Sequence, residues 1–531
     1  MGSIPKPVVL LVLDGFGISP EKRGNAILAA KKPNLDKIEK KFPFTLLQAS
    51  GLAVGLPWDE PGNSEVGHLT MGAGRAIYHH LPRIIAAIQD GSFFKNPAFL
   101  GVIDHIKRNN STLHLLGLVS SGSVHSYLDH LYALFELAKR ENVARVFLHA
   151  ITDGRDAPPE EAASLVRQLE ARIKGELPQV TLVSLLGRFF AMDRDLHWDR
   201  IRQAYEAITL AKGAPFEDPV QYLKECYGHG ITDEFIPPAY RIKNGSPLGR
   251  MGDGDGLIIF NFREDSMREI AAAFAQEPFQ GFLRERWPSL KIATMTEYDK
   301  NLPQVSAAFE PLEIYWPLAR VLAEGGRTQF HIAESEKYAH VTYFFNGGVE
   351  KPFTEEERMV IPSVAVPHFD DQPAMRTPEI TAKILERLGG YDFILANFAN
   401  ADMVGHTGNF QAVVQAIEAL DHAVGAIADA VVERGGTLVV TSDHGNAEQK
   451  IHPFSGETLT EHTSNPVPFY IIGREYQLVK ERSLQEILAI KKEAGGILAD
   501  VAPTILEIMR LHKPDEMTGK SLLPVLLDER R

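Results

Sequence analysis

Short runs of apolar and β-branched residues alternate with longer amphipathic stretches along almost the whole chain. The apolar runs have the length of buried strands and lie at residues 8–13, 113–119, 145–151, 180–185, 256–260, 290–295, 329–332, 393–398 and 437–441. The amphipathic stretches have helical periodicity and include residues 128–140, 159–174, 200–212 and 410–434. Buried strands that alternate with helices are typical of parallel sheets covered on both faces, so the sequence predicts an α/β fold.

Charge and apolar content narrow the classes of function. The 531-residue chain has 55 Lys and Arg against 69 Asp and Glu, and its net charge of −14 has the wrong sign for covering nucleic-acid phosphates over a broad face. The first apolar run stops at Asp14, and no later segment approaches the ~20 apolar residues of a membrane span. The single cysteine, Cys226, permits no internal disulfide. We therefore expect a soluble, cytoplasmic protein with neither nucleic acid nor a membrane as partner. We also expect a monomer that acts on a small molecule, although charge and composition do not determine either point.

Metal-type ligands follow three of the predicted strands. Asp14 ends the first strand, Asp402 and His406 follow another, and Asp443 and His444 follow a third. Because ligands of open α/β sheets bind at the carboxyl ends of parallel strands, we expect these side chains on one rim of one sheet. The first strand then belongs with the last third of the chain.

The segment between these ligands indicates a second domain. The step from Ser64 to Asp402 is far too long for a loop and contains strands and helices of its own, so we expect an inserted domain there. We place the two crossings at the proline-containing segments 78–82 and 310–317. The sequence thus predicts a discontinuous metal domain of residues 1–80 and 315–531, and an inserted α/β substrate domain of residues 81–314.

The densest candidate chemistry is a set of Asp and His side chains in the last third of the chain. These residues are Asp402, His406, Asp443, His444 and His462. Carboxylate and imidazole without thiolate suit Mn²⁺, Zn²⁺ or Co²⁺ in sites with open positions, which favours a metal site over isolated core or surface histidines. With Asp14 and Ser64 there are enough groups for two metals, which would clamp a phosphoryl group and the oxygens entering and leaving it.

Ser64 precedes a predicted amphipathic stretch, within the run Gly62-Asn63-Ser64-Glu65-Val66-Gly67-His68. A serine in such a position is commonly a helix N-cap. It is also well placed as a nucleophile, because the helix dipole favours an incoming phosphate and a metal can hold the hydroxyl as an alkoxide. The residues alone leave both interpretations open.

Arginines in Gly- and Asp-containing loops follow strands of the inserted segment. They are Arg155, Arg188, Arg194 and Arg263. One such arginine is usually a surface ion pair, but several at neighbouring strand ends of an acidic protein indicate a clamp for carboxylate and phosphate. Asp156 is either a general base toward a substrate hydroxyl or a salt-bridge partner. His125 is a candidate phosphate contact, and Lys337 either stabilises a leaving oxygen or is solvated.

A series of motifs follows in order along nearly the whole chain. The motifs are Leu13-Asp14-Gly15-Phe16-Gly17, Gly62-Asn63-Ser64-Glu65-Val66-Gly67-His68, Gly154-Arg155-Asp156, Asn261-Phe262-Arg263, Glu336-Lys337-Tyr338-Ala339-His340-Val341-Thr342, Asn400-Ala401-Asp402-Met403-Val404-Gly405-His406-Thr407-Gly408 and Asp443-His444-Gly445-Asn446-Ala447-Glu448. Together they resemble the cofactor-independent (2,3-bisphosphoglycerate-independent) phosphoglycerate mutase family of the alkaline phosphatase superfamily. The resemblance implies two domains, an alkaline-phosphatase-like metal domain and an inserted α/β substrate domain. It also implies an isomerase of glycolysis and gluconeogenesis that interconverts 3-phosphoglycerate and 2-phosphoglycerate through a phosphoserine.

The resemblance also implies roles for individual residues. It implies two Mn²⁺ ions, with Co²⁺, Zn²⁺ or Mg²⁺ as alternatives. One ion is expected on Asp14, Ser64, Asp443 and His444, and the other on Asp402, His406 and His462. The expected catalytic residues are Ser64, Asp156 and Lys337. The substrate is expected to meet His125, Arg155, Asp156, Arg188, Arg194, Arg263 and Lys337.

One position departs from the family pattern. The family usually has a second arginine three residues after that of Asn261-Phe262-Arg263, whereas this chain has Ser266, and Arg268 is a candidate substitute. The alternative to a mutase is a metal-dependent phosphomonoesterase or another phosphomutase of the same superfamily. A phosphomonoesterase would release inorganic phosphate. A non-catalytic metabolite-binding protein would lack the nucleophile or a ligand, and none is missing here.

Overall fold

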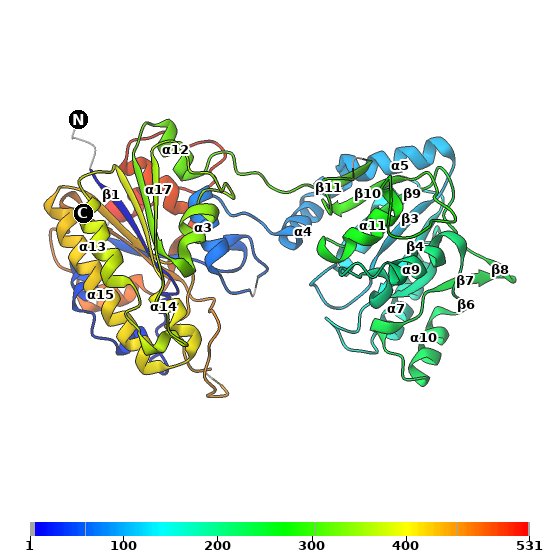
Figure 1. Cartoon of the computed structure of the whole chain (residues 1–531), viewed down its shortest axis with the longest axis horizontal. Coiled ribbons are helices and arrows are strands. Elements are labelled where there is room, and N and C mark those ends of the chain that lie inside the picture. Colours follow the sequence, from blue (N-terminus) through cyan, green and yellow to red (C-terminus); the bar gives the residue numbers. More distant parts are fainter. Residues whose placement is uncertain (1–5, 59, 303, 453, 529–531) are drawn as a thin grey trace. The chain divides into compact units, whose positions relative to one another are not determined.

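The computed structural model describes residues 6–58, 60–302, 304–452 and 454–528, and these residues form two compact units (Figure 1). The first unit consists of Met1–His79 and Leu312–Arg531. The second unit is the continuous segment His80–Pro311. Each unit contains its own sheet and its own cores.

The sheet of the first unit is built around the N-terminal strand. Its order is β13 (Glu356–Ile361), β12 (Gln329–Glu334), β14 (Phe393–Phe398), β1 (Val8–Leu13), β15 (Thr437–Thr441), β16 (Val467–Ile472), β2 (Phe44–Gln48) and β17 (Ala494–Ile497). Strand β1 pairs in parallel with β14 on one side and with β15 on the other. Strand β16 runs antiparallel to both of its neighbours, β15 and β2. Residues 8–13 therefore lie in the middle of a sheet made mainly by the last third of the chain.

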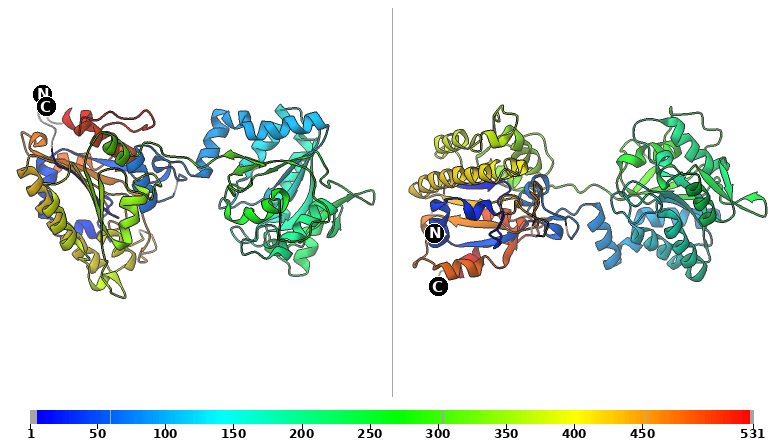
Figure 2. Two further views of the ribbon diagram at one scale, coloured as in Figure 1. Left: turned by 45° about the horizontal axis from the view of Figure 1, so that its top comes forward. Right: turned by 90° about the horizontal axis from the view of Figure 1, so that it is seen from below.

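Alternate side chains of β1 enter two different cores, as expected for a strand buried on both faces. Val9, Leu11 and Leu13 pack in the core that includes α13 and α15, whereas Val8 and Leu10 pack in the core that includes α3, α12 and α17. The long helix α15, drawn in yellow, covers one face of the sheet, and helices in orange to red cover part of the other (Figure 2). The helices of this unit are α1 (Ala26–Ala29), α2 (Pro33–Lys41), α3 (Ser64–Ala73), α12 (Leu318–Glu324), α13 (Thr377–Arg387), α14 (Asn400–Met403), α15 (Phe410–Glu433), α16 (Leu484–Ile490), α17 (Val501–Ile508) and α18 (Leu523–Asp528).

The second unit has a sheet of the same general kind. Its order is β11 (Val305–Phe309), β10 (Lys291–Thr296), β9 (Gly256–Ile259), β3 (Leu113–Leu118), β4 (Val146–Thr152), β5 (Val180–Gly187), β7 (Ala239–Lys243) and β6 (Ala214–Phe216), and β8 (Ser246–Pro247) pairs with β7. The strands from β11 to β5 pair in parallel, and β7 is antiparallel to β5. The carboxyl ends of β3, β4 and β5 therefore share one edge.

Helices cover both faces of this second sheet. Leu113 and Leu115 of β3 belong to the core with α5, α6 and α7, and Leu116 and Leu118 to the core with α9 and α11. The helices are α4 (His80–Asp90), α5 (Pro97–Asn109), α6 (Leu128–Arg140), α7 (Ala162–Glu176), α8 (Arg188–Ala191), α9 (Trp198–Leu210), α10 (Pro219–Gly228) and α11 (Arg268–Ala275).

The predicted α/β class is confirmed, and a strand is present at each of the nine predicted apolar runs. Antiparallel β16 and β7 were not predicted, nor was β2 or any of the short or edge strands β6, β8, β11, β13 and β17. No helix in the described part of the chain is long and apolar enough to cross a membrane.

Candidate metal centre and arginine cluster

Three strands of the first sheet end at one place and deliver carboxylates there. Leu13, the last residue of β1, is in register with Phe398, the last residue of β14, and the backbone N–H of Asp14 donates to the carbonyl of Phe398 (3.0 Å). Strand β15 ends beside β1 and is followed by Asp443. The strand ends therefore meet at one rim, because the register of the parallel pairs aligns them.

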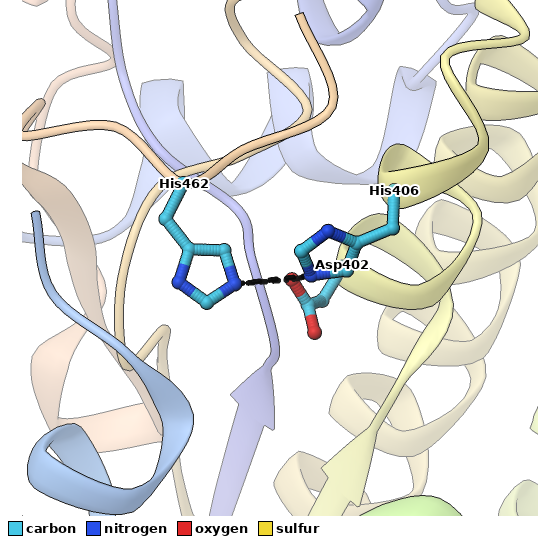
Figure 3. Close-up of side chains that lie close together, drawn as sticks. All are labelled: Asp402, His406 and His462. Carbon is cyan, nitrogen blue, oxygen red and sulfur yellow. Dashed lines mark hydrogen bonds and ion pairs between the residues drawn. The ribbon is translucent and has the colours of Figure 1, made fainter. Parts of the chain in front are cut away.

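One group of candidate ligands consists of Asp402, His406 and His462 (Figure 3). His406 Nε2 lies 3.1 Å and His462 Nε2 3.2 Å from the same carboxylate oxygen, Asp402 Oδ1. Asp402 is on α14, directly after β14, and His462 comes from the loop before β16. Donor atoms from two distant segments thus converge on one point.

A second group in the described residues consists of Asp14, Asp443 and His444, all fully buried. His444 Nε2 lies 3.4 Å from Asp14 Oδ1 and 3.7 Å from Asp443 Oδ2. The rings of His444 and His462 stack with their centroids 3.9 Å apart, so the second group adjoins the first.

The second ring nitrogen of each candidate histidine ligand faces a backbone carbonyl. His406 Nδ1 donates to Thr460 (2.7 Å), His462 Nδ1 to Gly62 (2.9 Å), and His444 Nδ1 to Gly445 (3.2 Å). A carbonyl oxygen only accepts, so each Nδ1 carries a hydrogen. Nε2, which faces the carboxylates, is then the nitrogen with a lone pair when the ring is neutral, as metal binding requires.

Ser64 lies at the first position of α3, and the N-cap is its neighbour Asn63, whose side chain accepts from the backbone N–H of Val66 (2.9 Å). The interpretation of Ser64 as the cap is therefore wrong. Its hydroxyl instead lies 3.1 Å from Asp14 Oδ1 and 3.0 Å from His444 Nε2. The hydroxyl at the start of this helix is thus held within the second group.

Lys337 connects the two groups. It follows β12, and its side chain is buried rather than solvated. Its ammonium donates to Asp14 Oδ1 (2.7 Å), Asp402 Oδ2 (2.6 Å) and Ser64 Oγ (2.6 Å). The sequence left open whether this lysine stabilises a leaving oxygen or is solvated, and the structure places it in contact with the Ser64 hydroxyl.

The carboxylates give the centre a strong preference for positive charge. Burial alone would lower the pKa of His444, but Asp443, Asp14 and Asp402 outweigh it and raise the pKa to about 10. Burial likewise opposes the charge of Lys337, yet Asp14 and Asp402 raise its pKa above the ordinary value. Burial would raise the pKa of Asp402 and Asp443, but neighbouring cations hold both well below the usual range.

The donor set therefore fits divalent cations. It combines carboxylate oxygens with imidazole nitrogens, the donors expected of Mn²⁺, Zn²⁺ and Co²⁺ sites. Asp443 Oδ2 lies 3.2 Å from His68 Nδ1. The hydrogen on that nitrogen is donated to the backbone carbonyl of Ser64 (2.8 Å). Asp443 Oδ2 therefore makes no well-formed hydrogen bond with the described residues. A buried carboxylate oxygen in this state is suited to a cation.

Sequence reasoning missed the residues that hold these ligands. Asn397 in β14 donates to Asp14 Oδ2 (2.7 Å) and lies 3.1 Å from His68 Nε2.

Glu448 is buried and accepts from the backbone N–H of Gly17 (3.1 Å) and from Asn465 Nδ2 (2.9 Å). Glu448 also accepts from the backbone N–H of Asn446 (2.9 Å) and from the hydroxyl of Thr463. It thereby ties together the loop after β1, the loop after β15 and the segment after His462. Its place at the end of the last motif was the signal that could have found it.

The second unit brings a different cluster together at the carboxyl ends of β3, β4 and β5. Arg188 is buried, and its Nη1 donates to Asp153 Oδ1 and Asp156 Oδ2, each at 2.6 Å. Its Nη2 lies 3.0 Å from His125 Nε2. Burial, followed by the charge of Arg188, lowers the pKa of His125 to about 4, so its ring is neutral at neutral pH and accepts this hydrogen bond. Asp153 was not predicted, although it stands in the same loop as Arg155.

The remaining candidate arginines of the second unit are more exposed. A cavity of about 110 Å³ is lined by residues that include His125, Arg155, Arg188 and Arg194. Arg155 pairs with Glu234 (2.5 Å), and Arg194 pairs with Asp265 (3.1 Å). Arg263 lies 3.3 Å from the same Asp265 and is the predicted arginine that does not line the cavity.

Ser266 also lines this cavity, and its hydroxyl is 3.4 Å from His125 Nδ1. Arg268 donates to the backbone carbonyl of Tyr298 (3.0 Å) and is not among the lining residues. The structure therefore gives no support to Arg268 as a substitute for the missing arginine.

Comparison with known proteins identifies the family. The model of the Metalloenzyme superfamily matches residues 6–513. The 2,3-bisphosphoglycerate-independent phosphoglycerate mutase of Clostridium botulinum (strain Langeland) is 46% identical over 520 residues, 98% of this chain and 99% of the relative, and that of Clostridium perfringens (strain SM101) is 47% identical with the same coverage. A crystal structure of Leishmania mexicana phosphoglycerate mutase at low cobalt concentration aligns over 97% of each chain, with 31% identity and a TM-score of 0.53.

Membership of a superfamily of metalloenzymes agrees with the two donor groups at the strand ends and implies divalent metal binding. The match covers both units, so the arginine cluster belongs to the shared part of the chain. The chain is a member of the 2,3-bisphosphoglycerate-independent phosphoglycerate mutase family, within the Metalloenzyme superfamily.

Proposed function

We propose that this protein interconverts 3-phosphoglycerate and 2-phosphoglycerate in glycolysis and gluconeogenesis, through a phosphoserine at Ser64 and without bisphosphoglycerate. The observation that carries the proposal is the position of the Ser64 hydroxyl. It is not used as a helix cap, and it lies within 3.1 Å of Asp14, His444 and Lys337. The relatives that match nearly the whole chain are named for this activity.

Ser64 is the nucleophile in this mechanism. Its oxygen forms a bond to phosphorus while the bond from phosphorus to the substrate oxygen breaks, and the proton that the serine gives up ends on this leaving oxygen, which becomes a hydroxyl of glycerate. Asp14 Oδ1 accepts the serine hydrogen bond and is the nearest carboxylate for the proton. The ammonium of Lys337 donates to Ser64 Oγ and stabilises negative charge there. The N-terminus of α3 adds a favourable dipole for the incoming phosphate.

We propose two Mn²⁺ ions for the centre, with Co²⁺, Zn²⁺ or Mg²⁺ as alternatives. Asp14, Ser64, Asp443 and His444 would hold one ion. Asp402, His406 and His462 would hold the other. When bound, such ions lower the pKa of the nucleophile and neutralise phosphoryl oxygens.

The arginine cluster would hold the glycerate part of the substrate. His125, Arg155, Arg188, Arg194 and Arg263 supply donors that match a carboxylate and a phosphate. Asp156 would take the proton of the acceptor hydroxyl when that oxygen attacks the phosphoserine. Its ion pair with Arg188 orients the carboxylate for this task. We further propose that the protein acts as a monomer in the cytoplasm.

The test is a ³¹P NMR assay of the purified protein with 3-phosphoglycerate and Mn²⁺, with no added bisphosphoglycerate. We expect 2-phosphoglycerate to form without net release of inorganic phosphate. Ser64→Ala is expected to abolish turnover while the fold and metal content are retained, and Ser455→Ala, in an exposed loop, is the matched control. Release of phosphate without the isomer would instead identify a phosphomonoesterase.

A further inference from the structure

A large apolar cavity lies in the first unit and contains none of the proposed metal ligands. Its volume is about 780 Å³, and it lies between α1 and α2 on one side and α16 on the other. Its buried part includes Phe16, Ile27, Leu35 and Ile487. Cavities of a few hundred to about 1,000 Å³ with mainly apolar walls are typical of small-molecule sites.

Three leucines at this cavity are exposed to solvent. Leu28 of α1 is 47% exposed, and Leu484 and Leu488 of α16 are 69% and 53% exposed. Single exposed leucines are ordinary on a protein surface, but three that line one apolar cavity add exposed apolar area at a single place. Removing such a surface from water favours binding of an apolar group.

Lysines surround the same cavity, although the protein as a whole is acidic. Two of them are already paired, Lys32 with Asp36 (2.5 Å) and Lys491 with Glu39 (2.6 Å). For Lys22, Lys40 and Lys492, also at the cavity, the described residues provide no carboxylate within ion-pairing distance. Their positive charge is therefore available to a ligand.

We propose that this cavity binds a small amphipathic anion, with an apolar body in the cavity and one acidic group at the lysines. Apolar walls alone would favour an uncharged ligand, and lysines alone would favour a free phosphate ion. The combination favours a molecule that carries both parts. The inference is independent of the proposed function, because Ser64, the six metal-donor side chains and the arginine cluster are all outside the cavity.

Two dyes with the same ring system test this proposal. One is 8-anilinonaphthalene-1-sulfonate, and the other is N-phenyl-1-naphthylamine, which lacks the sulfonate. Fluorescence titration of the full-length protein is expected to show saturable binding of the sulfonated dye with one molecule per chain. The double variant Lys40→Glu/Lys492→Glu is expected to bind the sulfonated dye about tenfold more weakly and the neutral dye within about twofold of wild type.

The controls separate charge, shape and folding. Lys224→Glu/Lys243→Glu makes the same change in net charge on exposed residues of the second unit and is expected to leave both dyes unaffected. Leu488→Glu is expected to weaken both dyes about tenfold, and Leu484→Glu is a second exposed position should that variant fold poorly.

Several results would overturn the proposal. The first is that the sulfonated dye shows no saturable binding. The second is that Lys40→Glu/Lys492→Glu loses affinity for both dyes equally. The third is that Leu488→Glu and Leu484→Glu both bind the dyes as wild type does. Concentration-dependent self-association of wild type that Leu488→Glu abolishes in sedimentation velocity would show that a second copy of the chain occupies the surface.

Discussion

Lys337 offers a quantitative test of the charge balance in the centre. Its ammonium contacts Asp14 and Asp402 at 2.7 and 2.6 Å and is almost completely buried. Lys337→Met keeps an unbranched side chain of similar length but removes the charge. We expect this variant to destabilise the first unit strongly without metal and only weakly when divalent metal is bound.

The magnitude follows from the two ion pairs. At an effective dielectric constant of about 20, a pair of unit charges this close attracts by about 6 kcal/mol before any desolvation cost is subtracted. Much of this attraction is offset by burying the ammonium, and removing one partner of a buried pair typically costs about 3–5 kcal/mol. We therefore expect the metal-free variant to lose about 3–5 kcal/mol, and the loss to fall below about 1 kcal/mol with saturating Mn²⁺, because the ions supply the missing positive charge.

Hydrogen exchange of peptides from β1, β14 and β15 measures the free energy of opening of this unit, and peptides from the second unit are an internal reference. Lys491→Met is the matched control, since this lysine of the same unit pairs with Glu39 (2.6 Å), which belongs to neither group of candidate ligands. Its effect is expected to be insensitive to metal. A loss below about 1 kcal/mol in the metal-free Lys337→Met protein, or an equal loss with and without Mn²⁺, would refute the reasoning.

Three further predictions concern other residues. Glu448→Gln is expected to weaken Mn²⁺ binding about 10- to 100-fold in calorimetric titration. The reason is that the amide of glutamine cannot accept hydrogen bonds from all four groups that donate to the carboxylate. An affinity within about twofold of wild type would contradict this prediction. Asp156→Asn is expected to raise the ratio of inorganic phosphate to isomer in ³¹P NMR, and an unchanged ratio with both activities reduced would remove it from the acceptor site. Burial raises the pKa of Asp233 to about 6, above its unfolded value, so its contribution to stability is fully present below about pH 4 and is lost as the pH rises through 6. The free energy of opening of α7, measured by hydrogen exchange, is expected to be about 2 kcal/mol lower at pH 7 than at pH 4 because of this group, and Asp233→Asn is expected to remove that part of the pH dependence.

The sequence predicted the central strands of both sheets well, because these strands are buried on both faces and appear as unbroken apolar runs. Strand β1 shows this clearly, with all six residues buried. Strand β16 is equally buried but contains Pro468 and runs antiparallel, and its local pattern does not say which strand it pairs with. Pairing between segments this far apart depends on the packing of the whole sheet.

Part of the candidate centre could also be predicted, since a carboxylate directly after a buried parallel strand is visible in the sequence. Asp14 and Asp443 were found in this way, and the structure brings them together. Their role as ligands remains a prediction. Asn397 could not be found, because it is the single polar residue of the buried strand β14. Such a residue has no local sign of its function until its partners are known.

The split of the first unit across the sequence has a consequence for how the chain folds during synthesis. Strand β1 is made first, yet its neighbours β14 and β15 are made only after the whole second unit. The N-terminal segment therefore waits with an apolar strand unpaired while the continuous second unit can already fold near the ribosome. Closing a sheet over such a separation is slow because of the entropy of loop closure, so strand β1 stays unpaired and open to chaperones until the C-terminal third emerges.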